Sequence, residues 1–313
     1  MIVYSPSRTE AYDMCSLKGA TLYKDGWMLK EADNGTVGRI AGAAFAEGTF
    51  RIHAGLSTGV LEAQSLFDRQ VNHYVSYGVT FSQDLVHTRD TLGKSLVKYA
   101  TQNPFSKWQI KGAEVVLKDY GNCRLDVLGI DPEGYWAIAD IKYKRQLKLD
   151  YLNKTINEYR DSWQFQHYPW AYNDYVYQNF NIQDGRGTAK DPTWEPAVRM
   201  YLVLVIAEPF RVLSYPFFTK DKLQVRWLRS AQQKWLDIKA IEDGEREPVM
   251  SAVHRDMYGD CPLKRACLEM DLDPQLMQHE YCRVPRMEEE NVTTKNVTNN
   301  EEYKEGTLCA VNT

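Results

Sequence analysis

Asp126, Asp140 and Lys142 are the residues in this chain of 313 whose types and spacing could best do chemistry together. Two carboxylates held side by side need a cation to offset their repulsion. Mg²⁺ and Mn²⁺ prefer carboxylate oxygens combined with water and phosphate oxygens. Such a metal polarises a phosphodiester and lowers the pKa of a water nucleophile, while a lysine ammonium stabilises negative charge on the phosphate. These residues therefore predict metal-dependent cleavage of a phosphodiester.

A β-hairpin is expected to bring the two aspartates together. Residues 122–129 alternate apolar and polar positions, residues 135–143 have the pattern of a second strand, and the residues of 131–134 favour a turn. A hairpin centred near residue 133 places Asp126 opposite Asp140. Because strand side chains alternate between faces, Lys142 then points the same way as Asp140. The competing interpretation is a surface hairpin whose charges only form cross-strand pairs.

The segment after the hairpin favours the first interpretation. Residues 157–172 begin as a helix, and Gln164 and Tyr168 lie four positions apart, which places them on one helical face. Both side chains can form hydrogen bonds with phosphate or with an attacking water.

With these residues in order, the chain resembles the RecB-type branch of the PD-(D/E)xK nuclease superfamily. The family pattern is a glycine before a strand aspartate, a strand with D-x-K, and a helix with Q-x-x-x-Y; Gly121 stands in the glycine position. The resemblance implies an α/β fold with a restriction-endonuclease-like central mixed β-sheet flanked by helices. It implies that Asp126 and Asp140 bind Mg²⁺ or Mn²⁺, that Lys142 is catalytic, and that Gln164 and Tyr168 contact substrate.

The same family has an upstream histidine that completes the metal shell. The segment Gly48–Leu56 resembles that motif with one extra residue, so the resemblance implies His53 as the third metal ligand. Glu62 and His87 are the alternatives. Glu114, in a strand-like stretch before the hairpin, could face the site, although a solvated strand residue is the favoured interpretation.

The cysteines resemble those of iron-sulfur members of this superfamily, which include AddB-type helicase-nucleases, CRISPR-associated adaptation nucleases and phage-encoded exonucleases. In those proteins one early and three late cysteines bind a 4Fe-4S cluster. The resemblance implies Cys15, Cys261 and Cys267 as ligands, with Cys282 as the fourth and His254 as its alternative. Zn²⁺ would accept the same donors. Unligated buried cysteines are the remaining interpretation.

Cys123, within the hairpin, and Cys309, within the C-terminal tail, are not expected to be ligands. Disulfides are not expected either, because no signal peptide or transmembrane run is evident and a cytoplasmic chain keeps its thiols reduced. A cluster joining residue 15 to the region beyond residue 260 would stabilise the fold by closing a long loop.

Composition and charge predict three regions. A nuclease domain with a helical N-terminal part is expected over residues 1–245, a cysteine-rich cluster-binding segment over 246–286, and a disordered polar tail over 287–313. Residues 199–206 predict a buried strand, and residues 222–241 a helix with an apolar stripe.

A net charge of −4 provides no global attraction to nucleic acid, so DNA contacts are expected to be local. The basic candidates, which lie beside the site, are Lys142, Lys144, Arg145 and Lys148. The aromatic candidates, which could stack on unpaired bases, are Trp163, Tyr168 and Trp170. Core packing is the alternative interpretation for the aromatic residues.

The sequence thus predicts a cytoplasmic, metal-dependent deoxyribonuclease, and the resemblance implies a bacterial or phage origin. We expect an exonuclease that processes single strands or free DNA ends in recombination, repair or phage replication. The alternative is a non-catalytic or partner-dependent DNA-binding subunit of a helicase-nuclease or CRISPR adaptation complex. No P-loop motif is present, so any helicase motor would belong to a partner.

Overall fold

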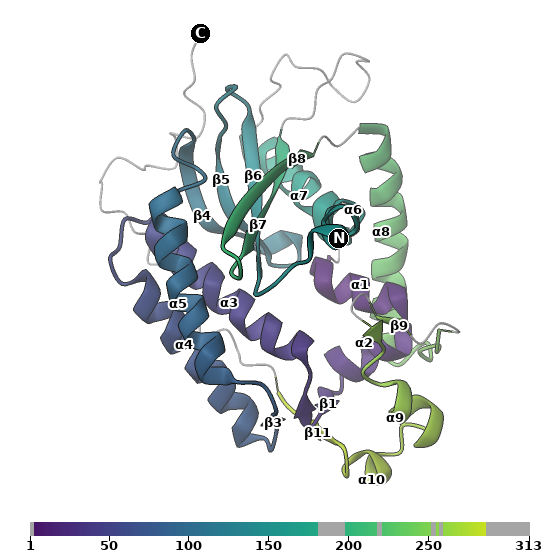
Figure 1. The fold of residues 1–313 in the computed structure, drawn as a ribbon. Helices are drawn as coiled ribbons and strands as arrows, with labels where there is room; N and C mark the ends of the chain where they lie inside the picture. Colours follow the sequence, from purple (N-terminus) through teal and green to yellow (C-terminus); the bar gives the residue numbers. More distant parts are fainter. Residues whose placement is uncertain (1–2, 181–197, 218–220, 252–254, 257–258, 286–313) are drawn as a thin grey trace.

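A computed structural model describes residues 3–180, 198–217, 221–251, 255–256 and 259–285 (Figure 1). It is a mixed α/β structure in which helices flank a five-stranded sheet. The strands lie in the order β4 (Gln109–Leu117), β5 (Cys123–Ile130), β6 (Trp136–Lys144), β7 (Arg199–Ile206) and β8 (Arg211–Phe217). Strands β6 and β7 are parallel and every other neighbouring pair is antiparallel, so the sheet is mixed as predicted.

The central strands are buried on both faces, which is why β7 has an almost uninterrupted apolar sequence. Its predicted bounds, residues 199–206, are confirmed. Alternate residues of β6 enter two separate cores: Ile138 belongs to one, and Ala139 and Ile141 belong to the other.

One core lies between the sheet and helices that come from the start and the second half of the chain. The helices that supply it are α1 (Pro6–Met14), α2 (Ser16–Tyr23), α6 (Leu152–Arg160), α7 (Trp163–Phe180) and α8 (Asp221–Glu242). The predicted helix over residues 222–241 is confirmed as α8, one residue longer at each end. On the opposite face, the second core is covered by α3 (Asn34–His53), α4 (Gly59–Ser76) and α5 (Leu85–Gln102) (Figure 1).

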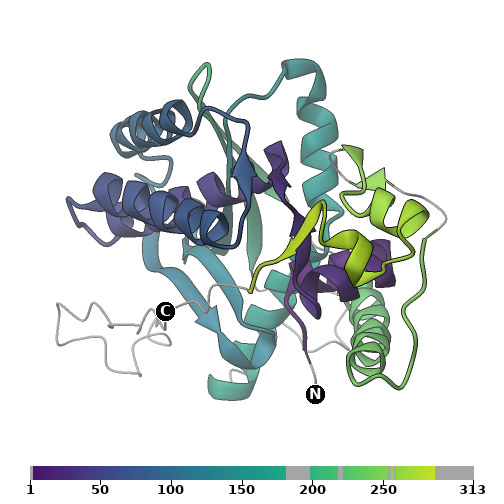
Figure 2. The same ribbon diagram turned by 90° about the horizontal axis from the view of Figure 1, so that it is seen from below.

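A smaller unit joins the two ends of the described chain. Strand β1 (Trp27–Leu29) pairs antiparallel with β11 (Tyr281–Arg283), so the segment that carries α9 (Lys264–Glu269) and α10 (Pro274–Met277) lies beside the N-terminal helices (Figure 2). The remaining short elements are β2 (Glu31–Ala32), β3 (Thr80–Phe81), β9 (Arg255–Asp256), β10 (Gly259–Asp260), and the 3-10 turns η1 (Lys118–Tyr120) and η2 (Leu149–Tyr151).

Within the residues that the structure describes, no helix combines the length and the apolar character needed to cross a membrane. The tail predicted over residues 287–313 lies outside the described residues.

Candidate active site

The two aspartates meet where β5 and β6 stop pairing. The ladder runs from Ile130 opposite Trp136 to Val127 opposite Ala139, so the predicted hairpin register is confirmed and Asp126 and Asp140 follow as the next opposed positions. At that point a carboxylate oxygen of Asp126 accepts a hydrogen bond from the backbone N–H of Ile141 at 2.6 Å. The side chain of Asp126 therefore occupies the gap that opens between the strands.

Four side chains form a hydrogen-bonded chain around Asp140. The Lys142 ammonium donates to Asp140 Oδ1 at 2.9 Å and to Gln164 Oε1 at 2.8 Å. The Gln164 amide donates to the same Asp140 oxygen at 2.8 Å and to Tyr168 Oη at 2.5 Å. Lysine can only donate and an ionised carboxylate can only accept, so this arrangement fixes the orientation of the Gln164 amide. The predicted residues Asp140, Lys142, Gln164 and Tyr168 are thus brought together.

The start of α7 determines where Gln164 lies. After α6, the N–H and hydroxyl of Ser162 both bond the Tyr159 carbonyl, and α7 begins at the next residue, Trp163. Gln164 and Tyr168 then share one helical face, as their spacing predicts. Tyr168 is buried in the core beneath that face, which holds the helix against the sheet.

Asp140 is the most unusual group of the site. Its side chain is 0% exposed, and its second oxygen, Oδ2, is buried without a hydrogen-bond partner among the residues that the structure describes. A buried acceptor left unpaired is costly unless something else binds it. Burial raises the pKa of Asp140, and burial together with the charge of Asp140 raises the pKa of Asp126. Two crowded carboxylates with one unpaired oxygen fit a hard divalent cation such as Mg²⁺ or Mn²⁺.

Glu114 lies beside this pair, and the interpretation of it as a solvated strand residue is wrong. The neighbouring β4–β5 pairs place Glu114 opposite Asp126, its side chain is 15% exposed, and it forms an ion pair with Arg124 at 3.2 Å. Its charge contributes to the raised pKa of Asp126. Its backbone has φ +52°, a left-handed conformation that is uncommon for glutamate and typical of functional sites. Its sequence neighbours gave no sign of this conformation.

Gly121 has a structural reason to precede the first aspartate. Its φ is +71°, and a Cβ atom there would lie 2.6 Å from the backbone carbon of Tyr4. Only glycine fits both requirements without displacing the N-terminal segment. The turn from η1 into β5, which sets the start of the strand that carries Asp126, depends on this residue.

His53 ends α3 on the other side of the sheet. Its Nε2 lies 2.9 Å from Tyr99 Oη, and its ring also contacts Phe105. Burial lowers its pKa to about 4, so the imidazole is neutral at physiological pH, the form that binds metals. Burial and then the charge of Asp126 raise the pKa of Tyr99, so the tyrosine that contacts His53 also feels the charge of the aspartate. The role of His53 as a metal ligand stays a prediction, because no three His, Cys, Asp or Glu side chains among the described residues converge closely enough to hold an ion.

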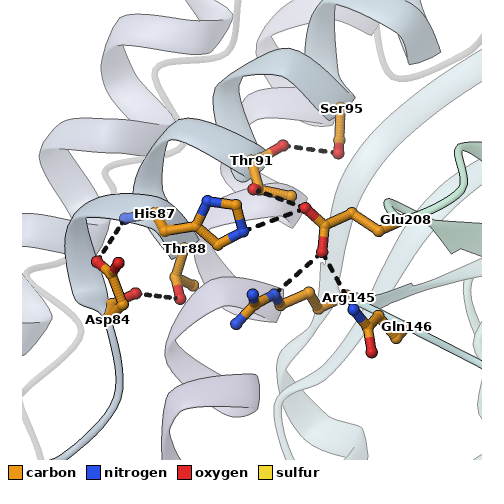
Figure 3. Close-up of polar contacts among 8 residues, drawn as sticks. All are labelled: Asp84, His87, Thr88, Thr91, Ser95, Arg145, Gln146 and Glu208. Atoms are coloured by element: carbon orange, nitrogen blue, oxygen red, sulfur yellow. Dashed lines mark hydrogen bonds and ion pairs between the residues drawn. The ribbon is translucent and has the colours of Figure 1, made fainter.

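His87, one alternative to His53, belongs to a separate polar cluster. Its ring lies 3.2 Å from a Glu208 oxygen, which Thr91 also contacts (Figure 3). Arg145 and Gln146, which follow β6, bond the other Glu208 oxygen at 3.3 and 3.4 Å. Arg145, predicted to contact DNA, is therefore engaged in this cluster. Glu62, the other alternative, lies in the first turn of α4.

The aromatic residues beside the site mostly pack inside the protein. Tyr168 and Trp170 are buried, and Trp170 contacts Tyr120, Trp227 and Trp235, so core packing is the correct interpretation for these two. Trp163 is only partly buried and donates a hydrogen bond to Asp13 at 3.1 Å. Lys144 is partly exposed and Lys148 is exposed.

Three of the predicted cluster ligands, Cys15, Cys261 and Cys267, influence one another electrostatically, but in the described part of the chain they do not converge closely enough to hold an ion. The charges of Cys261 and Cys15 add to burial in raising the pKa of Cys267 to about 11. Cys15 caps α2, and its sulfur accepts hydrogen bonds from the backbone N–H groups of Lys18 and Ser251, both at 3.4 Å. Hydrogen bonds to sulfur are a feature of thiolates that ligate iron.

Cys282 packs elsewhere, although it was the favoured fourth ligand. It contacts a small apolar cluster that includes Ala32 and Val79, whereas Cys261 and Cys267 contact a different cluster around Trp27 and Tyr281. The strand alternation of β11 explains this, since Cys282 and Tyr281 point to opposite sides. His254 and Cys309 lie outside the described residues, and Cys123 is buried in the sheet.

No protein-family model matches this chain, and comparison with curated protein sequences finds no match. Among solved structures, the chain is similar to the crystal structure of a candidate exonuclease from Eubacterium rectale. The two share 14% sequence identity over 87% of this chain and 93% of the other, with a TM-score of 0.46. At that identity and TM-score, the likeness supports no statement about the activity of this chain.

Proposed function

We propose that this protein is a metal-dependent deoxyribonuclease of the RecB-like PD-(D/E)xK type. The observation that carries this proposal is the environment of Asp140: a fully buried carboxylate with one oxygen bonded to Lys142 and Gln164 and the other without a hydrogen-bond partner in the described part of the chain. A structural ion pair would gain stability by satisfying both oxygens. An unpaired oxygen beside a second carboxylate, Asp126, is instead what a cation site requires.

Asp126 and Asp140 would hold Mg²⁺ or Mn²⁺, which supplies Lewis-acid polarisation of the phosphate and a water of lowered pKa. The ammonium group of Lys142 stabilises the negative charge that develops on the phosphate oxygens. The Gln164 amide bonds both the Lys142 ammonium and the Asp140 carboxylate and so fixes their relative positions. The Tyr168 hydroxyl accepts a hydrogen bond from the remaining amide N–H. This chain of hydrogen bonds fixes the lysine before substrate arrives, so little reorganisation is needed during the reaction.

The substrate that we propose is DNA, either single-stranded or with free ends, and the activity is that of an exonuclease in recombination, repair or phage replication. Lys144 is the last residue of the catalytic strand β6 and Lys148 follows that strand, and both would contact the phosphate backbone. A helicase or recombination protein is the kind of partner that would supply such ends.

We further propose a 4Fe-4S cluster bound by Cys15, Cys261 and Cys267, with Zn²⁺ as the alternative occupant. The backbone N–H groups of Lys18 and Ser251 directed at the Cys15 sulfur support this proposal. The cluster would act as a structural staple between the N-terminal helices and the C-terminal segment, remote from the phosphate chemistry.

Digestion of end-labelled single- and double-stranded DNA with Mg²⁺ or Mn²⁺ tests the nuclease proposal. Protein purified without oxygen should cleave DNA, and Lys142→Ala should lower the rate by roughly 100-fold or more, as the loss of a preorganised charge-stabilising group does. Lys239→Ala is the matched control, because Lys239, on α8, forms an exposed ion pair with Asp243. Absence of cleavage by folded, metal-loaded protein would exclude a stand-alone enzyme and favour a DNA-binding or partner-dependent subunit.

A further inference from the structure

The catalytic lysine shares an aromatic ring with a second lysine. The Nζ atoms of Lys142 and Lys144 lie 5.8 and 5.5 Å from the ring centroid of Tyr159. The two lysines are two positions apart on β6, so their side chains leave the same face of the strand. Both distances are within the roughly 6 Å over which a cation is attracted to an aromatic ring.

The ring of Tyr159 is held firmly. Its side chain is 9% exposed and belongs to the core beneath α7, where it packs against Phe165 at 6.4 Å between ring centroids. Ser162 donates two hydrogen bonds to the Tyr159 carbonyl, one from its hydroxyl at 2.7 Å and one from its backbone N–H at 3.0 Å. The same turn that positions Gln164 therefore positions this ring.

A lysine side chain has four rotatable bonds, so holding its ammonium in one place is entropically costly. Attraction to a ring face restrains the ammonium without requiring a hydrogen-bond acceptor. It also draws two like charges to one place, which is favourable when a polyanion binds. A tyrosine ring that served only to pack the core would not require two lysine ammonium groups beside it.

We propose that Tyr159 is a positioning residue for the nuclease reaction, which holds Lys142 at the scissile phosphate and Lys144 at a neighbouring phosphate of the same strand. This inference rests on the proposed function. Lys142 acts on the reacting phosphate, so its displacement lowers kcat. Lys144 acts only in binding, so its loss raises KM.

Steady-state cleavage by Tyr159→Phe, Tyr159→Leu and Lys144→Gln tests this assignment. Tyr159→Phe keeps the ring and should stay within about twofold of wild type, whereas Tyr159→Leu should lower kcat roughly tenfold, as expected for losing a desolvated cation–ring contact of that size. Lys144→Gln should raise KM severalfold with kcat unchanged. Equal damage in the Phe and Leu variants, or an unchanged kcat in Tyr159→Leu, would overturn the proposal.

A measurement independent of catalysis separates this inference from the proposed function. In protein labelled with ¹³C-lysine, the ε-methylene signals of Lys142 and Lys144 should be shifted upfield by the ring, as assigned with Lys142→Ala and Lys144→Gln. Both shifts should persist in Tyr159→Phe and vanish in Tyr159→Leu. Tyr77→Leu, at the exposed tyrosine that follows the last residue of α4, is the control and should leave them unchanged. Failure of wild-type cleavage would contradict the proposed function, whereas unshifted signals in wild type would contradict the role of Tyr159.

Discussion

A carboxylate oxygen of Asp126 lies 2.6 Å from the backbone nitrogen of Ile141. This contact stands where a backbone–backbone hydrogen bond would form if the β5–β6 ladder continued. The side chain therefore ends the pairing of the strands that position it. This contact holds Asp126 next to Asp140 despite their like charges, and it concentrates the electrostatic cost of the fold at the proposed metal site.

Removing that charge should stabilise the metal-free protein. The pKa of Asp126 is raised on folding, first by burial and then by Asp140. A carboxyl whose pKa is raised on folding destabilises the fold as pH rises above its unfolded pKa of about 3.9. We expect Asp126→Asn to melt several degrees higher than wild type at neutral pH in EDTA, with the difference shrinking toward pH 4.

Thermal melts followed by circular dichroism across this pH range check the expectation. Asp90→Asn, at an exposed position of α5, is the control and should melt as wild type does. Added Mg²⁺ or Mn²⁺ should stabilise wild type more than Asp126→Asn. A variant that melts no higher than wild type at neutral pH would show that the carboxylate pair carries no such cost.

His53 should remain neutral through the physiological range. Burial lowers its pKa to about 4, and neutral histidine bonds Tyr99. Since the unfolded pKa is about 6.5, His53 should reduce stability as pH falls from about 6.5 toward 4, and not above that window. In histidine NMR spectra its ring signals should not titrate between about pH 5 and 8. A titration with a midpoint above pH 6 would refute the buried, neutral state.

The same spectra test His53 as a metal ligand. Mn²⁺ broadens signals of nuclei close to it, so a ligating His53 should lose its signal when Mn²⁺ is added. His73, which lies on α4 and contacts the Pro285 carbonyl, provides a remote reference. If the His53 signal persists while cleavage is supported by Mn²⁺, the ion is held without this histidine.

Gln164 should matter more than Tyr168 for turnover. Its amide bonds both Lys142 and Asp140, whereas Tyr168 contacts only the amide of Gln164 within this chain of four. We expect Gln164→Ala to lower kcat by roughly 10- to 100-fold, and Tyr168→Phe by less than about tenfold, because single preorganising hydrogen bonds have effects of this order. Single-turnover cleavage with saturating DNA measures both. The reverse order of effects would point to Tyr168 as the direct substrate contact.

Serine replacement should divide the cysteines into two groups. We expect Cys15→Ser, Cys261→Ser and Cys267→Ser to lose bound iron and absorbance near roughly 400 nm, since thiolate ligation is what holds such clusters. Cys282→Ser should retain iron, because Cys282 packs in a different apolar cluster. Cys123→Ser is the matched control for a buried thiol that is not a ligand. The iron content of each variant, purified without oxygen, distinguishes the two groups. Loss of iron from Cys282→Ser would show that Cys282 is the fourth ligand.

The parts of the site that local sequence rules determine could be predicted. The two-residue period of strands and the turn at residues 131–134 fix the hairpin register, and the helical repeat fixes Gln164 relative to Tyr168. Long-range packing determines the rest. The left-handed backbone of Glu114 and the contact of His53 with Tyr99 depend on segments far apart in the chain. Likewise, only the pairing of β1 with β11 shows that Cys282 points away from Cys261.

Metal-dependent cleavage by the Asp140 site is the central claim, and Asp140→Asn tests it most directly. The exchange keeps the size of a fully buried side chain while removing the charge that would hold the ion. We predict that wild type degrades end-labelled DNA in Mn²⁺ and that Asp140→Asn, folded and with its iron content unchanged, shows cleavage reduced by roughly 100-fold or more. Undiminished cleavage by the folded variant would contradict this account.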